Sequence, residues 1–265
     1  MSEDTSKANE KKSLIQSDFG ITWTARSAIL VAVITYLAAQ FLGAELISTY
    51  PALRHWSHEY TLNWINNSVI AQFFYVLFAE GFTVILLGLF IKWRKGSWRA
   101  IGLKKPKILA DLAWALTGVA VYFPLYIVVV SILGDLIKSL SLNQQQQVGF
   151  SQSTTGWALV LVFLSLVILP PIVEEIMFRG FLFSGLKKSL PKIWAILLTS
   201  LIFASPHLLE GTSGGALWIA GIDTFVLSLV LCWLREKTGR LYAGMGLHAL
   251  KNFVAFASLF LFHVH

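Results

Sequence analysis

The sequence has little charge and almost no cysteine. Only 13% of its 265 residues are charged whereas 56% are hydrophobic, a balance too apolar for a water-soluble domain of this length. Cys232 is the single cysteine, which excludes an intrachain disulfide and a metal cluster built from cysteines. The first apolar run lacks an obvious small-residue cleavage site, so we expect an uncleaved anchor helix rather than a signal peptide.

Long apolar stretches are present instead. A stretch of about 20 apolar residues is long enough to cross the hydrocarbon core of a bilayer as a helix. We therefore predict an all-α, polytopic membrane helix bundle with about seven to eight transmembrane helices. The expected spans are about 26–43, 68–91, 109–137, 157–188, 191–207, 216–234 and 241–262. Pro170 and Pro171 are expected to divide the fourth span into two segments, and Pro124 to tilt or kink the third.

The basic residues are unevenly distributed along this predicted bundle. Most of them gather near 7–26, 92–107, 187–192 and 235–240. By the positive-inside rule this distribution places the N-terminus in the cytoplasm, and we expect the plasma membrane of a bacterium or archaeon. The segment 92–107 also contains two tryptophans and is predicted to lie on the membrane surface. Because these cations are spread over separate loops without a recognisable nucleic-acid-binding module, the net charge of +7 does not indicate nucleic acid as a partner.

Two adjacent carboxylates and a guanidinium interrupt the fourth span at Glu174, Glu175 and Arg179. Ionisable groups at bilayer depth cost roughly 2.5 to 3.5 kcal/mol each on insertion scales, so they are candidates for function, although a Glu–Arg pair can also be purely structural. Glu175 and Arg179 are four residues apart and share a helix face, so we predict that they pair. Glu174 then has no local partner, as suits a general base working near neutral pH in an apolar site.

Other polar residues fall within the predicted spans. His248 and Asn252 share one helix face, and His207 belongs to a different span. A lone histidine on an apolar helix is more often a hydrogen-bonded core residue than a catalyst. Together with Glu174, however, these groups can hold and polarise a water and stabilise an oxyanion. Glu80 either belongs to such a site or hydrogen-bonds between helices, and we favour the second interpretation.

The motifs Glu174-Glu175-Ile-Met-Phe178-Arg179, Phe203-x-x-x-His207 and His248-x-x-x-Asn252 follow one another on separate apolar spans. In this order they resemble the motifs of the CPBP intramembrane proteases, also called the CAAX-processing or Abi family. The resemblance covers about residues 157–262. It implies a polytopic endopeptidase related to the type II enzymes that remove the terminal tripeptide from prenylated CAAX proteins.

The resemblance also implies roles for the motif residues. Glu174 would activate water, His207 would help to hold that water, and His248 and Asn252 would form the oxyanion site. Glu175 and Arg179 would support them. The chain then divides into a polar cytoplasmic leader, N-terminal transmembrane helices and a protease-like catalytic transmembrane core, at residues 1–24, 25–150 and 151–265.

One geometric point opposes this arrangement. The helical rise places Glu174 roughly 20 Å from the basic end of its span, but His248 only about 12 Å from the basic end of the seventh span. Tilted helices or an early start of the seventh span would be needed to bring the two residues to one depth. Lys251, beside Asn252, is expected to snorkel or to pair with an acid such as Asp223.

Alternatives to a metal-free protease remain open. Glu174, His207 and His248 could ligate zinc, although the sequence has no His-Glu-x-x-His spacing and only two histidines within reach, so we expect no cofactor. A non-catalytic scaffold, a bacteriocin self-immunity protein or a transporter would belong to another class, and the lack of an inverted repeat counts against transport. The expected partners of a protease are the lipid bilayer and a hydrophobic or lipidated peptide.

Overall fold

The computed structural model describes residues 20–137, 149–151, 154–209 and 216–263. Within these residues the chain forms helices and no strand. Seven helical stretches in this part of the chain are long and apolar enough to cross a membrane. The predicted all-α membrane bundle is therefore confirmed, while most of the predicted leader, residues 1–19, lies outside the described residues.

The seven spans follow the predicted order closely. The first three membrane-length helices are α2 (Ala25–Leu53), α4 (Val69–Trp93) and α5 (Ile108–Leu136), and the short α3 (His58–Asn67) joins the first two. The fourth span consists of α6 (Ala158–Phe163), η1 (Leu164–Ile168), α7 (Leu169–Glu174), η2 (Glu175–Leu182) and α8 (Phe183–Ser189). The remaining spans are α9 (Lys192–Ala204) with η3 (Pro206–Leu209), α10 (Trp218–Thr238), and α11 (Tyr242–Phe256) with η4 (Ala257–Leu261).

Local sequence signals explain where several helices begin and end. The Thr24 side chain accepts a hydrogen bond from the backbone N–H of Ser27, and Ser57 and Ser68 cap α3 and α4 in the same way. α10 ends at Gly239, whose φ of 63° is the left-handed conformation that glycine adopts at little cost. The connections from α2 to α4 and from α10 to α11 are short, and both of these pairs of helices pack against each other.

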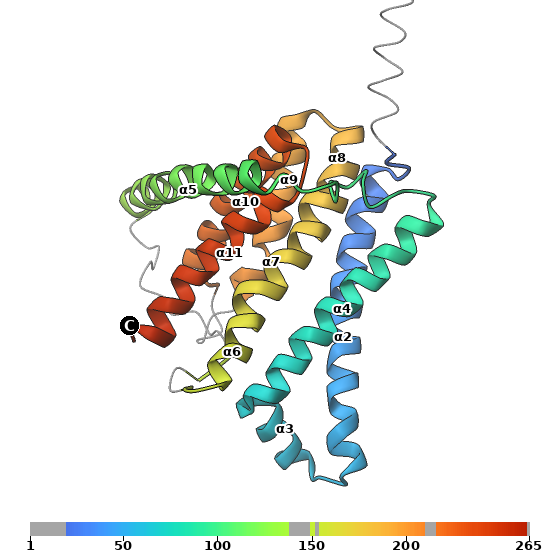
Figure 1. The fold of residues 1–265 in the computed structure, drawn as a ribbon, viewed down its shortest axis with the longest axis vertical. Coiled ribbons are helices and arrows are strands. Elements are labelled where there is room, and N and C mark those ends of the chain that lie inside the picture. Colours follow the sequence, from blue (N-terminus) through green and yellow to red (C-terminus); the bar gives the residue numbers. More distant parts are fainter. Residues whose placement is uncertain (1–19, 138–148, 152–153, 210–215, 264–265) are drawn as a thin grey trace, which may run out of the picture.

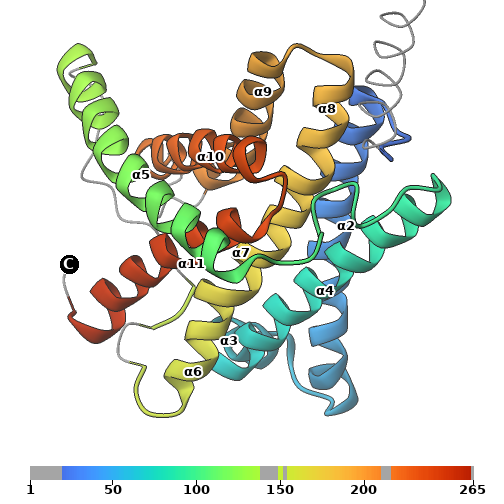
Figure 2. The same cartoon turned by 45° about the horizontal axis from the view of Figure 1, so that its top comes forward.

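The fourth span runs through the middle of the bundle (Figure 1). α2 and α4 pack against each other on one side of it, and α9, α10 and α11 lie on the other side. α5 crosses α10 and α11, and its far end extends away from the other helices (Figure 2). Only 11% of the most apolar stretch of α5 is buried against the rest of the protein. In a membrane this helix would therefore present most of its surface to lipid.

The fourth span is one continuous helical run, so the prediction that the prolines divide it into two segments was wrong. Instead, the helix widens to π geometry over η1, directly before Pro170 and Pro171, and again over η2. A proline has no N–H and its ring clashes with the preceding turn, and a π-turn relieves both problems without ending the helix. Pro124 likewise lies inside an uninterrupted α5.

The segment between α4 and α5 packs against the fourth span at Ile101. Ile101 in this segment is fully buried, and its carbonyl oxygen would be 3.2 Å from a Cβ atom added to Gly180 of the fourth span. Leu241, which precedes α11, packs at the same glycine, and its Cδ1 atom would be 3.3 Å from the added Cβ atom. The absence of a side chain at Gly180 thus lets the start of α11 approach the middle of the fourth span.

This contact answers the depth problem raised by the sequence. Glu174 precedes Gly180 by six residues, or roughly 9 Å of helix, and His248 follows Leu241 by seven residues, or roughly 10 Å. Because Gly180 and Leu241 touch, the carboxylate and the imidazole reach nearly the same depth. α11 begins at Tyr242, so the seventh span does not start earlier than predicted. The two residues approach one depth because the start of α11 lies beside the middle of the fourth span.

Candidate active site

Glu174 and Glu175 leave the fourth span in different directions. The Glu175 side chain is 1% exposed, whereas that of Glu174 is 24% exposed and lines a cavity. His248 of α11 lies beside both carboxylates, with its Nε2 atom 3.7 Å from Glu174 Oε2 and its Nδ1 atom 3.5 Å from Glu175 Oε1. These distances exceed those of ordinary direct hydrogen bonds, so the imidazole stands beside both acids without being bonded tightly to either.

Glu175 forms a buried ion pair with Arg179. The Arg179 Nη1 atom donates to Glu175 Oε1 at 2.8 Å, and the Arg179 side chain is fully buried, which confirms the pairing predicted from the four-residue spacing. The guanidinium carbon lies 4.2 Å from the centre of the Phe203 ring, a cation–π contact. Arg179 neutralises the charge of Glu175. Glu174 is therefore the carboxylate of the two that faces the cavity.

Phe203 is a component of the site to which sequence reasoning gave no role. Its ring is 1% exposed and makes edge contacts with His207 and His248, at centroid distances of 5.5 and 5.8 Å. It therefore lies between the two histidines and also covers Arg179. The sequence signal for this role is its position four residues before His207, which places both rings on one face at the end of α9.

The Asn252 side chain is held by a backbone carbonyl that Pro170 and Pro171 leave without a helical donor. Its Nδ2 atom donates a hydrogen bond of 2.9 Å to the carbonyl oxygen of Leu166. In an α-helix this carbonyl would accept from residue 170, and in a π-helix from residue 171, but both are prolines without an N–H. The carboxamide of α11 thus supplies the donor that the fourth span lacks.

The open space beside Glu174 is a cavity of about 240 Å³. Its polar lining comes from four parts of the chain, with Gln40 on α2, Glu80 on α4, Glu174 on α7 and His207 on η3. Glu80 had been interpreted from the sequence chiefly as an interhelical group, and its place in this lining favours the alternative that it belongs to the site. His248 and Asn252 are not among the residues that line the cavity, although His248 Nε2 lies 3.7 Å from Glu174 Oε2.

Lys251 and Asp223 form an ion pair outside this cavity. The Lys251 Nζ atom lies 2.7 Å from Asp223 Oδ2, as one of the sequence expectations proposed, and the hydroxyl of Tyr122 donates to Asp223 as well. The three residues come from α11, α10 and α5. None of them lines the cavity beside Glu174, so this cluster joins helices and is separate from the candidate site.

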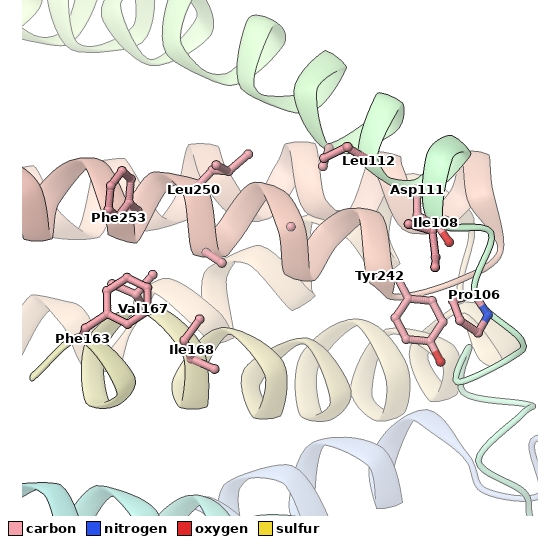
Figure 3. Close-up of a pocket in the computed structure, with 13 residues that line it drawn as sticks. Pro106, Ile108, Asp111, Leu112, Phe163, Val167, Ile168, Tyr242, Leu250 and Phe253 are labelled. Carbon is pink, nitrogen blue, oxygen red and sulfur yellow. The ribbon is translucent and has the colours of Figure 1, made fainter. Parts of the chain in front are cut away.

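A second hollow, of about 520 Å³, lies on the other side of the fourth span (Figure 3). Its lining is almost entirely apolar, and Figure 3 shows Phe163 and Val167 of the fourth span near Phe253 of α11. None of the six candidate residues lines it. The smaller cavity is therefore the candidate site, because ionisable side chains line it, whereas the larger hollow is apolar.

The described side chains around the cavity do not form a cluster of metal ligands. Across the ranges that the structure describes, no three side chains of histidine, cysteine, aspartate or glutamate are grouped in a way that could hold a metal ion. A catalytic zinc site needs three such protein ligands around one point. Glu174, His207 and His248 surround the cavity region without forming that arrangement.

The fold and the cavity define a class of protein, a polytopic membrane helix bundle with a polar internal site, in which Glu174 lies beside His248 and lines a cavity together with His207. The family comparison gives this class a name. Residues 156–254, less than half of the chain, match the family described as type II CAAX prenyl endopeptidase Rce1-like, so this region is similar to the family suspected from the motifs. No curated protein and no solved structure matches the chain.

The matched region contains all six candidate residues but not α2, α4 or α5. The Rce1-like family is a protease family, and at this level the comparison supports a peptidase. Together with the seven membrane-length helices, it supports an integral, multi-pass membrane protein that contacts the lipid bilayer.

Proposed function

We propose that this protein is an intramembrane endopeptidase that cleaves membrane-associated or lipidated peptides, with Glu174 activating the attacking water. The observation that carries the proposal is the partly exposed Glu174 carboxylate, which lines the cavity while its neighbour Glu175 is neutralised by Arg179. Of the two adjacent acids, only Glu174 is placed to accept a proton from a water molecule in that cavity.

The proposed reaction needs no group beyond water and the side chains of the site. Glu174 takes a proton from water as the water oxygen attacks the scissile carbonyl carbon, and the carbonyl oxygen becomes an oxyanion. His248 and Asn252, one helical turn apart on α11, donate hydrogen bonds to that oxyanion, while His207 orients the water. The protonated Glu174 then gives its proton to the departing amine nitrogen as the C–N bond breaks.

The substrate and the orientation in the membrane belong to the same proposal. A peptide that carries an apolar or lipidated segment can reach a membrane-embedded cavity by lateral movement in the bilayer. We place the N-terminus in the cytoplasm, because the clusters of basic residues at 92–107, 187–192 and 235–240 then lie on the inner side of a bacterial or archaeal plasma membrane.

The test is cleavage by purified protein in detergent, measured on a lipidated CAAX peptide and on a library of membrane-anchored peptides. Glu174→Gln should lower kcat by at least about a thousandfold, because an amide cannot accept the proton from water. Glu59→Gln, an equivalent change on the exposed face of α3, is the matched control and should leave cleavage unchanged. Cleavage by Glu174→Gln at the wild-type rate would refute the proposal.

A chelator separates the metal-free mechanism from the zinc-dependent alternative. We expect cleavage to continue in the presence of a strong chelator, since the described residues provide no cluster of three metal ligands. Loss of cleavage on chelation that is restored by added zinc would show a metalloenzyme that uses the same cavity.

A further inference from the structure

The cavity beside Glu174 contains a second carboxylate from outside the Rce1-like region. Glu80 lies on α4, and the same face of this helix contributes Val76, Ala79 and Thr83 to the lining. α4 packs against α7, the segment that ends at Glu174. Two acidic side chains from different helices therefore face one partly open cavity within the helix bundle.

The two carboxyl groups have no permanently charged basic partner in the lining of the cavity. No lysine or arginine is among the residues that line the cavity. Arg179 and Lys251, the cations closest in sequence to the candidate residues, already have acidic partners, Arg179 with Glu175 at 2.8 Å and Lys251 with Asp223 at 2.7 Å. The histidines at 207 and 248 are the remaining groups near Glu174 that can carry positive charge.

Two carboxyl groups that share one cavity favour a cationic group placed between them, because a cation offsets the repulsion between their ionised forms. The cavity of about 240 Å³ is several times larger than the roughly 30 Å³ that one water molecule occupies in the liquid. It therefore has room for part of a ligand as well as the attacking water. Gln40 and Tyr75, which are hydrogen-bonded to each other across α2 and α4, add further polar groups to its lining.

From this arrangement we infer that Glu80 binds a basic side chain of the peptide substrate, so that the enzyme prefers to cleave next to a lysine or an arginine. The inference rests on the proposed protease function and specifies its substrate class. In this role Glu80 is a specificity-determining residue: it holds the substrate cation, while Glu174 remains the carboxylate that acts on water. The N-terminal helices would then select the peptide on which the Rce1-like region acts.

The experiment compares two membrane-anchored peptides that differ only in having lysine or norleucine at each position around the cleaved bond, in a detergent without amine groups. Wild-type protein should show a kcat/KM for the lysine peptide at least about tenfold higher than for the norleucine peptide at one position. Glu80→Gln should reduce this ratio to about one. Thr83→Val, an uncharged change in the same lining, should retain the preference.

The variant Glu80→Lys gives an independent result, because a reversed charge should favour a glutamate peptide over the lysine peptide. Equal cleavage of the lysine and norleucine peptides by wild type would overturn the inference while leaving the protease function in place. So would an equal loss of kcat on both peptides in Glu80→Gln, which would mean that Glu80 acts on Glu174 rather than on the substrate.

If wild type cleaves no peptide, the proposed protease function fails, and the inference about Glu80 is decided by binding. The affinities of the lysine and norleucine peptides for wild type and Glu80→Gln are then measured directly, by fluorescence anisotropy in the same detergent. Tighter binding of the lysine peptide that depends on Glu80 supports a basic-peptide site, and equal binding of both peptides refutes it.

Discussion

The backbone of Gly244 lies against the carboxylate of Glu175. A Cβ atom added to Gly244 would be 2.6 Å from Glu175 Oε2, closer than non-bonded atoms approach. Gly244 is one turn before His248 on α11, so its missing side chain lets the buried acid sit between Arg179 and the imidazole. The ion pair inside the fourth span and the histidine on α11 are thus connected through a glycine.

Gly244→Ala is expected to reduce cleavage by at least about tenfold. The new methyl group must displace the Glu175 carboxylate, and this carboxylate contacts both Arg179 and His248. Misplacement of reacting groups by an ångström is enough for such a loss. The measurement is kcat per folded protein, with folding checked by size-exclusion chromatography and thermal unfolding.

Gly246→Ala is the matched control on the same helix. A Cβ atom there would approach the Ala115 methyl group of α5 to 2.9 Å, a comparable clash that is remote from the candidate residues. It should lower thermal stability without lowering kcat. Wild-type kcat in Gly244→Ala, or an equal loss of kcat in both variants, would contradict the positional role of Gly244.

Arg179→Met should destabilise the fold by about 3 to 5 kcal/mol, because it leaves the buried Glu175 carboxylate without its cation. Replacing both partners, as Arg179→Met with Glu175→Leu, should cost much less than the sum of the two single changes. Thermal unfolding in detergent measures all three variants. Additive losses would show that the pair makes no specific contribution to stability, in spite of its complete burial.

Asn252→Leu should cost about 1 to 3 kcal/mol, because it leaves the Leu166 carbonyl without a hydrogen-bond donor. The same change should cost less in a Pro170→Ala background, where residue 170 regains an N–H that can donate to this carbonyl. The comparison is made by thermal unfolding, which is independent of any effect of Asn252 on catalysis. An equal cost in both backgrounds would show that the prolines are not the reason for this bond.

Asp223→Leu should destabilise the protein by about 1 to 3 kcal/mol, since Lys251 would lose its acidic partner within the membrane. Lys251→Met added to Asp223→Leu should recover part of the loss. Neither residue lines the cavity, so kcat per folded protein should stay at the wild-type level. A large fall in kcat with normal stability would instead link this cluster to the reaction.

Much of the fold could be predicted from the sequence. The lengths of the apolar stretches gave the order and approximate limits of the seven spans, because a helix must match the thickness of the hydrocarbon core. The four-residue spacing gave the Glu175–Arg179 pair, since helix periodicity is local. The effect of Pro170 and Pro171 was misjudged, because the choice between a broken helix and a π-turn depends on whether neighbouring helices hold the chain straight.

The sequence by itself therefore determined the class of protein and the identity of the polar residues inside the membrane, since both follow from composition and helical spacing. Only the tertiary structure decided how deep each residue lies and which cavity it faces. The contact at Gly180 raised His248 to the depth of Glu174, and the packing of α4 on α7 brought Glu80 to the same cavity. Such relations depend on how closely two helices approach, which side-chain size sets at contacts between residues far apart in the chain.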